Sequence, residues 1–187
     1  MKSLKCFVAR STAILLLCAA GTGAAYADFS GYYTLDNWTL EMTLGTNGFV
    51  DPSTGDATTI MLTSSFNETG GFTDFFITVP ADGTVSFDWF FDIPATEVPF
   101  EFAGYLLNGT SVQFGTVPSV VFAPLMVPVL AGDVFGFYVE SFDGLFEPGI
   151  LTITNFSAPV PVPAALWLFG SALLGLGALR RRFSTRS

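Results

Sequence analysis

Residues 83–92 read Gly-Thr-Val-Ser-Phe-Asp-Trp-Phe-Phe-Asp, and this run indicates the fold class. Large apolar residues occupy every second position from Val85 to Phe91, and they alternate with Ser86, Asp88, Phe90 and Asp92. Successive side chains of a strand point to opposite faces, so the pattern predicts a strand with one apolar face. Trp89 shares the apolar positions and is predicted to lie in the core.

The same alternation recurs at residues 38–44, 60–63 and 135–140. Asn108-Gly109 predicts a tight hairpin between residues 102–107 and 110–114. Three prolines within residues 117–130 favour edge strands or a wrapping loop there. About eight short strands with turns at this spacing predict an all-β fold, an antiparallel β-sandwich of jelly-roll type, over residues 28–158.

Charge is divided sharply along the 187 residues. The seven basic residues all lie within ten residues of a terminus, and the sixteen acidic residues all lie between Asp28 and Glu147. Segment 28–158 therefore has sixteen acids, no Lys or Arg and no His. Such a segment repels polyanions, so nucleic acid and anionic lipid are excluded as its ligands.

The same absences narrow the chemistry of segment 28–158. Without His, Cys, Lys or Arg it has none of the usual nucleophile–base pairs, and we expect no catalytic residues and no enzyme activity. Asp88 and Asp92 could form a glycosidase-like carboxylate pair. Their Cα atoms would be about 13 Å apart on one strand, which favours two solvated acids instead.

Two binding chemistries stay open. Asp51 and Asp56 lie at the two ends of a loop that contains Gly and Pro, and their carboxylates could hold Ca²⁺. The loop lacks the EF-hand spacing, so a solvated turn is the simpler interpretation. Exposed aromatic rings beside acids would suit a glycan-binding face. The candidates for exposure are Phe90, Tyr32, Tyr33 and Tyr138.

The N-terminal end has the order of a secretory signal peptide. Three basic residues within 1–10 precede an apolar run at 13–20, and Ala25-Tyr26-Ala27 supplies small residues at the −3 and −1 positions. We therefore expect residues 1–27 to be a signal peptide that signal peptidase removes after Ala27. Cys18 raises lipidation as an alternative, but the preceding Leu17 is bulky for a lipoprotein box.

The C-terminal end, residues 159–187, has a different organisation. Pro161-Val162-Pro163 precedes an uncharged run at 164–179, and Arg180, Arg181 and Arg182 follow it. A helix over that run would be about 24 Å long, a little less than the hydrocarbon core of a bilayer. We predict a single transmembrane helix with its arginines in the cytoplasm and residues 28–158 outside.

Residues 160–182 resemble a PEP-CTERM sorting signal, in which a Pro-x-Pro motif precedes an apolar helix and an Arg cluster. Here Val162 stands where the family name has Glu. The resemblance implies that exosortase recognises and removes the tail, in a Gram-negative bacterium that makes exopolysaccharide and biofilm. A plain C-terminal anchor that is never cut is the alternative.

The middle of the chain also resembles a recurrent exported domain of PEP-CTERM proteins. The matching stretches are 28–31, 37–39, 83–89, 104–109, 131–137 and 154–159. The resemblance implies a sandwich without an established catalytic activity. The expectation is an exported structural protein of the cell surface or extracellular matrix, anchored in the inner membrane before processing and in contact with exopolysaccharide. A glycan- or calcium-binding module is the first alternative, and a carboxylate-based glycosidase is the second.

Overall fold

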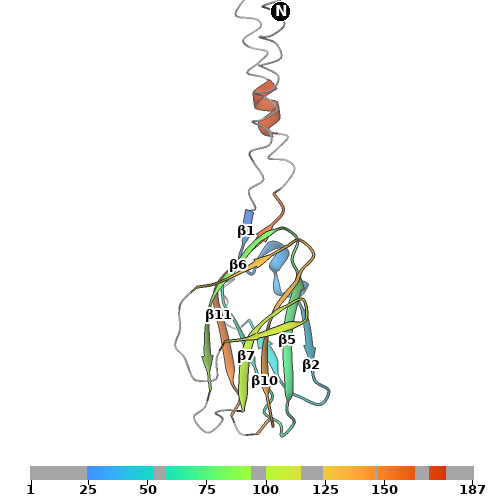
Figure 1. The fold of residues 1–187 in the computed structure, drawn as a ribbon, viewed down its shortest axis with the longest axis vertical. Coiled ribbons are helices and arrows are strands. Elements are labelled where there is room, and N and C mark those ends of the chain that lie inside the picture. Colours follow the sequence, from blue (N-terminus) through green and yellow to red (C-terminus); the bar gives the residue numbers. More distant parts are fainter. Residues whose placement is uncertain are drawn as a thin grey trace, which may run out of the picture. The chain divides into compact units, whose positions relative to one another are not determined.

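A computed structural model describes residues 25–52, 58–93, 100–114, 124–145, 147–162 and 169–175. Residues 26–160 form one compact unit of strands (Figure 1). The rest of the chain belongs to a second unit, of which residues 169–175 are described as helix. Within the described part of the chain, no helix is both long and apolar enough to cross a membrane. Most of the predicted transmembrane helix 164–179 lies outside the described residues.

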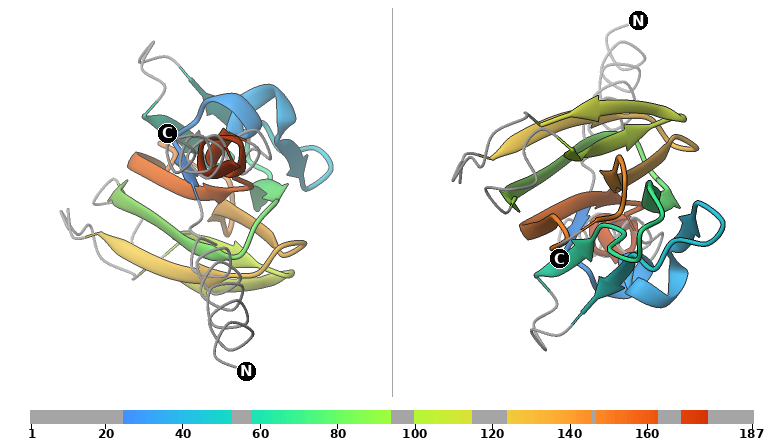
Figure 2. Two further views of the ribbon diagram at one scale, coloured as in Figure 1. Left: turned by 90° about the horizontal axis from the view of Figure 1, so that it is seen from above. Right: turned by 90° about the horizontal axis from the view of Figure 1, so that it is seen from below.

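The strands form two sheets, arranged as two layers (Figure 2). The first sheet has the order β3-β4-β11-β6-β9, with β1 paired to β11. Its strands are β1 (Ala25–Ala27), β3 (Phe49–Asp51), β4 (Ile60–Thr63), β6 (Gly83–Asp92), β9 (Leu125–Val129) and β11 (Ile150–Val160). This six-stranded sheet contains the run 83–92 that indicates the fold class.

The second sheet has the order β2-β5-β10-β7-β8. Its strands are β2 (Thr39–Met42), β5 (Gly71–Thr78), β7 (Glu101–Leu107), β8 (Thr110–Gln113) and β10 (Val134–Ser141). Two short 3₁₀ helices, η1 (Gly31–Tyr33) and η2 (Leu35–Asn37), precede β2. From β4 to β11 every connection except the β7–β8 hairpin passes from one sheet to the other, which is the double-sheet connectivity of a jelly roll. The antiparallel sandwich expected from the sequence is confirmed.

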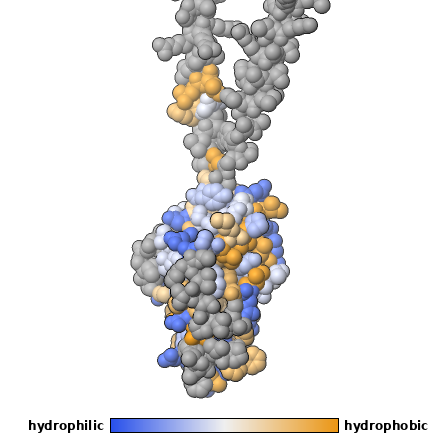
Figure 3. All heavy atoms as spheres, turned by 60° about the vertical axis from the view of Figure 1, so that its left-hand side comes forward, coloured by the Kyte–Doolittle hydropathy of each residue, from blue (hydrophilic) through white to orange (hydrophobic). Residues whose placement is uncertain are grey.

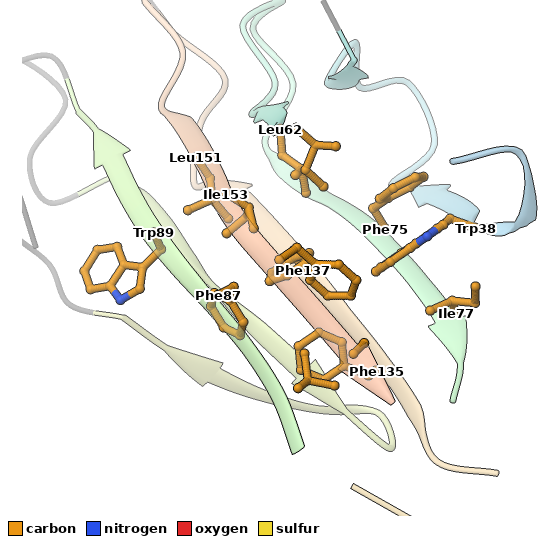
Figure 4. Packing of buried hydrophobic residues seen from close by; sticks show 14 of the residues in the cluster. Trp38, Leu62, Phe75, Ile77, Phe87, Trp89, Phe135, Phe137, Leu151 and Ile153 are labelled. Carbon is orange, nitrogen blue, oxygen red and sulfur yellow. The ribbon is translucent and has the colours of Figure 1, made fainter. Parts of the chain in front are cut away.

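Aromatic side chains from both sheets fill the space between the layers (Figure 4). The rings of Phe87 on β6 and Phe137 on β10 meet edge to face, with their centroids 4.9 Å apart. Trp38 stacks on Phe75, with 5.0 Å between centroids, and its indole N–H donates to the Tyr33 carbonyl. Such offset and edge-to-face pairs stabilise a core beyond the burial of their area.

The hairpin predicted at Asn108-Gly109 is also confirmed. Both residues have positive φ, 51° and 75°, as the two central residues of a type I′ turn require. Asn108 connects the turn to the start of β10, the neighbour of β7 in the sheet. Its side-chain oxygen accepts a hydrogen bond from the Val134 N–H, and its amide donates to the Asp133 carboxylate. The turn therefore sets the β7–β8 register and holds it against β10.

The burial expected for the strand at residues 38–44 is wrong. The alternation at residues 38–44 predicts a strand with a buried apolar face, but only Trp38 is buried there. β2 covers Thr39–Met42, all four of its residues are exposed, and Leu44 is 97% exposed. β2 is the edge of its sheet, so its apolar side chains have core neighbours on one side only. Apolar side chains accordingly also reach the surface of the compact unit (Figure 3).

The proline-rich region contains the expected edge strand. β9 is the last strand of the six-stranded sheet, and Pro128 lies within it. Proline has no N–H to donate, so it is tolerated at the open side of an edge strand. Residues 115–123 of the same region lie outside the described residues.

Candidate functional site

The outer face of the five-stranded sheet brings together polar and aromatic residues from all five strands. Pairing between neighbouring strands places one residue of each strand in a single row across this face. The row, called the central row below, consists of Glu41, Asp74, Tyr138, Gly104 and Gln113 in the order β2-β5-β10-β7-β8. Antiparallel partners that face each other interact directly, so this row is a contiguous strip.

Aromatic residues lie on both sides of the central row. One neighbouring row contains Phe76, Gly136 and Leu106, and the other contains Phe72, Glu140 and Phe102. Phe72 is 37% exposed, and Phe76 and Phe102 are half-buried. Ring surface is therefore available to solvent beside the carboxylates, which is the combination anticipated for a glycan-binding face.

Two glycines shape the centre of this face. A Cβ atom on Gly104 would lie 2.5 Å from Cε1 of Tyr138, so the tyrosine ring lies against the bare backbone at this position. A Cβ atom on Gly136 would lie 2.5 Å from the Cβ of Phe76 and 2.6 Å from the Phe75 carbonyl oxygen. Side chains at either position would displace their neighbours. The Tyr138 ring and the Phe76 side chain therefore lie close to the sheet backbone at these two glycines.

Tyr138 corrects an expectation from the sequence. It is a candidate for exposure by its position in the strand, but its side chain is only 7% exposed because it packs down over Gly104. Burial, with the nearby carboxylates Glu140 and Asp74, raises the pKa of its hydroxyl. Among the described residues, nothing donates to or accepts from that hydroxyl. Tyr138 thus places a hydroxyl without a hydrogen bond to a described residue in the middle of the face.

Asp74 is the unusual carboxylate of the central row. It is half-buried, and burial, followed by repulsion from Glu41 and then Glu140, raises its pKa to about 6. Like charges directly opposite each other on neighbouring strands destabilise a sheet, and Glu41 is the direct partner of Asp74. The folded protein therefore holds Asp74 in an unfavourable environment, which is common at functional sites.

The other aromatic candidates are distributed elsewhere. Tyr32 is 43% exposed, as predicted, and its hydroxyl donates to the Thr78 carbonyl. Tyr33 is fully buried, contrary to expectation, because its ring joins the core and its hydroxyl donates to the Pro159 carbonyl. Phe90 is half-buried on β6. Trp89 is 9% exposed and lies in the core, as predicted.

The predicted carboxylate and metal candidates lie in the other sheet. Asp88 and Asp92 share the outer face of β6, where Asp88 accepts a 2.7 Å hydrogen bond from the Asn155 amide. Asp51 ends β3, and Asp56 lies outside the described residues. Within the described ranges, no three acidic, His or Cys side chains form a cluster that could hold a metal ion. The Ca²⁺ site stays a prediction.

The predicted processing residues are only partly described. Ala25 and Ala27 belong to β1. Pro161 and Val162 follow β11 without regular secondary structure, while Pro163 and the Arg180–Arg182 cluster lie outside the described residues. The compact unit ends at residue 160, directly before the Pro-x-Pro motif.

Sequence reasoning missed Glu41, Asp74, Glu140 and Gln113 as site residues. Glu41 and Glu140 occupy polar positions of alternating strands, which by itself indicates only a solvated face. The signal that could have found Asp74 is its place between Phe72 and Phe76, a lone acid among aromatic residues. Their assembly in adjacent rows depends on strand order and register, which single-strand patterns do not contain.

The chain matches no described protein family and no curated protein. Solved structures with a similar fold include a carbohydrate-binding module of the β-sandwich superfamily described as promiscuous in specificity, with 16% identity and a TM-score of 0.42, over 74% of this chain and 62% of that one. A second is the module TmCBM61 in complex with β-1,4-galactotriose, with 10% identity and a TM-score of 0.43, over 75% of this chain and 100% of that one. A third is a family 35 carbohydrate-binding module from Clostridium thermocellum, with 15% identity and a TM-score of 0.36, over 70% and 98%.

Proposed function

We propose that this protein is an exported glycan-binding protein whose binding surface is the outer face of the five-stranded sheet. The observation that carries the proposal is the central row with its aromatic neighbours. Glu41 and Asp74 offer carboxylates in line, and Phe72 and Phe102 lie beside them. Sugars are recognised by this combination, since hydrogen-bonding groups fix the hydroxyls and rings pack on the apolar side of the sugar.

The proposal is of a binding module and not of an enzyme. The segment that forms the sandwich has no His, Cys, Lys or Arg, so general acid–base chemistry would fall to carboxylates and tyrosines. The carboxylate pair considered from the sequence, Asp88 and Asp92, comes from a single strand, and Asp88 already accepts a hydrogen bond from the Asn155 amide. A binding role needs only the surface already described.

A panel of immobilised glycans, probed with the full chain purified in detergent, tests the binding proposal. The expected result is retention of the protein on at least one class of polysaccharide, and loss of that retention in Tyr138→Ala. Asp92→Asn, an exposed acid on the opposite sheet, is the matched control and should leave retention unchanged. Failure to bind any glycan would refute the proposal. Release of reducing ends from a bound glycan would show instead that the face is catalytic.

We also propose that the chain is exported and sorted as its two ends suggest. The supporting features are the Ala25-Tyr26-Ala27 site and the PEP-CTERM-like tail, which begins where the compact unit ends. Such sorting would deliver the glycan-binding face to the cell surface, where exopolysaccharide is its natural partner.

Mass spectrometry of the protein from a native exosortase-containing cell tests the sorting proposal. The expected mature N-terminus is Asp28, and the expected C-terminus lies upstream of Arg180. Neutral replacement of Arg180, Arg181 and Arg182 should block normal processing, because the arginines orient the tail and belong to the family's signal. An intact tail on the exported wild-type protein would leave a permanent anchor as the correct interpretation.

A further inference from the structure

We infer that the glycan held by the outer face is a cationic one, a polymer of amino sugars with free, protonated amino groups. This inference rests on the proposed function and specifies its ligand. Its evidence is the charge of the face, the position of Asp74 and the chemistry of Tyr138.

The charge of the face selects a cationic partner. Glu41, Asp74 and Glu140 come from three adjacent strands, β2, β5 and β10. Adjacent strands lie about 4.8 Å apart, so the three carboxylates are spread over about 10 Å of the face. The sandwich segment contributes no Lys, Arg or His to neutralise them. A polyanionic glycan would be repelled, and a neutral one would leave the carboxylates without a counter-charge.

Asp74 gains most from a cation. Its carboxylate is half-buried, faces Glu41 across the strand pair and has Glu140 nearby, and no described residue supplies a hydrogen bond to it. An ammonium group beside it would return the interaction energy that burial and like charge remove. On binding, Asp74 would change from a destabilising carboxylate into one half of an ion pair, and this gain is a reason for the protein to keep it.

Tyr138 supplies the second half of an ammonium site. It is the direct cross-strand partner of Asp74, it is more than nine-tenths buried, and its hydroxyl makes no hydrogen bond to a described residue. An ammonium held by Asp74, the direct cross-strand partner, can also donate a hydrogen bond to this hydroxyl. The hydroxyl is free to bind a sugar oxygen.

The shape of the face favours a sugar polymer over a basic peptide. An extended peptide recognises a sheet by adding to an edge strand, whereas the acids here lie on the face of the sheet. Phe72, Phe76 and Phe102 flank the central row and provide apolar contact for the carbon side of pyranose rings. A lysine chain offers no comparable flat apolar surface.

Calorimetric titration of the full chain in detergent, at a mildly acidic pH that keeps the glucosamine amino groups protonated, tests this inference. The probes are β-1,4-linked hexasaccharides of glucosamine, of N-acetylglucosamine and of glucose. We expect the glucosamine oligomer to bind at least about tenfold more tightly than its acetylated counterpart. Asp74→Asn should remove this preference, so that the glucosamine and acetylated oligomers bind with similar affinity, and Asp92→Asn should retain the preference.

The outcomes separate this inference from the proposed function. Equal affinity for the three oligomers, or a preference that survives in Asp74→Asn, would overturn the cationic ligand and leave glycan binding intact. Tighter binding of oligolysine than of the glucosamine oligomer would show that charge alone is recognised, and would overturn the sugar. Absence of binding to every glycan, with a native-like thermal transition, would refute the proposed function itself.

Discussion

The indole ring of Trp89 stacks on the phenyl ring of Phe114, with the ring centroids 4.5 Å apart and the planes 12° from parallel. Trp89 belongs to β6 in the six-stranded sheet, and Phe114 directly follows β8 in the other sheet. The two rings therefore connect the layers at one side of the core, beside the Phe87–Phe114 contact at 5.9 Å.

Replacement of Trp89 by alanine should lower the free energy of unfolding by about 3–5 kcal/mol, because truncation of a large buried side chain leaves a cavity. Trp89→Phe should cost clearly less, since it retains a ring against Phe114. Chemical denaturation of the full chain measures both values. A loss below about 1 kcal/mol for the alanine variant would contradict a core position for Trp89.

Gly104→Ala should destabilise the protein by about 1–3 kcal/mol through overpacking. The added methyl group would lie 2.5 Å from the Tyr138 ring, and the Val112 carbonyl also obstructs it. Gly109→Ala is the control for a glycine without this crowding: a Cβ there would have no atom within 4 Å, although the φ of 75° adds some strain. Thermal unfolding compares the two variants. A larger loss at Gly109 would show that backbone strain, rather than contact with Tyr138, dominates.

Asp74 should make the protein less stable as pH rises from about 4 to about 6. Its pKa is raised from the ordinary value of 3.8 to about 6 in the folded state, so in this pH window the folded state binds more protons than the unfolded state. Asp74→Asn should match wild type below the window and exceed it above by about 1–2 kcal/mol, after allowance for solvent screening.

Urea midpoints of wild type and Asp74→Asn across the pH range measure this difference. The other carboxylates are common to both proteins, so the difference isolates Asp74. A constant difference at every pH would mean that the aspartate titrates normally in the folded protein.

Salt should stabilise the sandwich. Sixteen carboxylates without an internal cation repel one another, and a Debye length of about 8 Å near physiological ionic strength screens this repulsion. Calcium should raise the thermal midpoint more than sodium at equal ionic strength if Asp51 and Asp56 hold the ion, because a ligand of the folded state alone stabilises it. Coincident calcium and sodium series would exclude that site, and a midpoint insensitive to both would refute the charge argument.

The sandwich can be predicted from local patterns in the amino-acid sequence. Alternation at residues 85–91 and 135–139 fixed which side chains enter the core, since the side-chain period of a strand is local. Asn108-Gly109 likewise fixed its hairpin, because the positive φ values of that turn select Asn and Gly. These features depend on neighbours in the chain, and so they can be read from it.

The acids and rings that meet on the outer face cannot be predicted from local patterns, because their meeting depends on strand order and register. Glu41, Asp74, Tyr138 and Gln113 are aligned by four strand pairings between segments far apart in sequence. Tyr138 and Tyr33 looked alike as candidates for exposure, yet one packs over a glycine on the outer face and the other enters the core. Alternation assigns a side chain to one of two faces, but burial on that face depends on the neighbours that strand order and register supply.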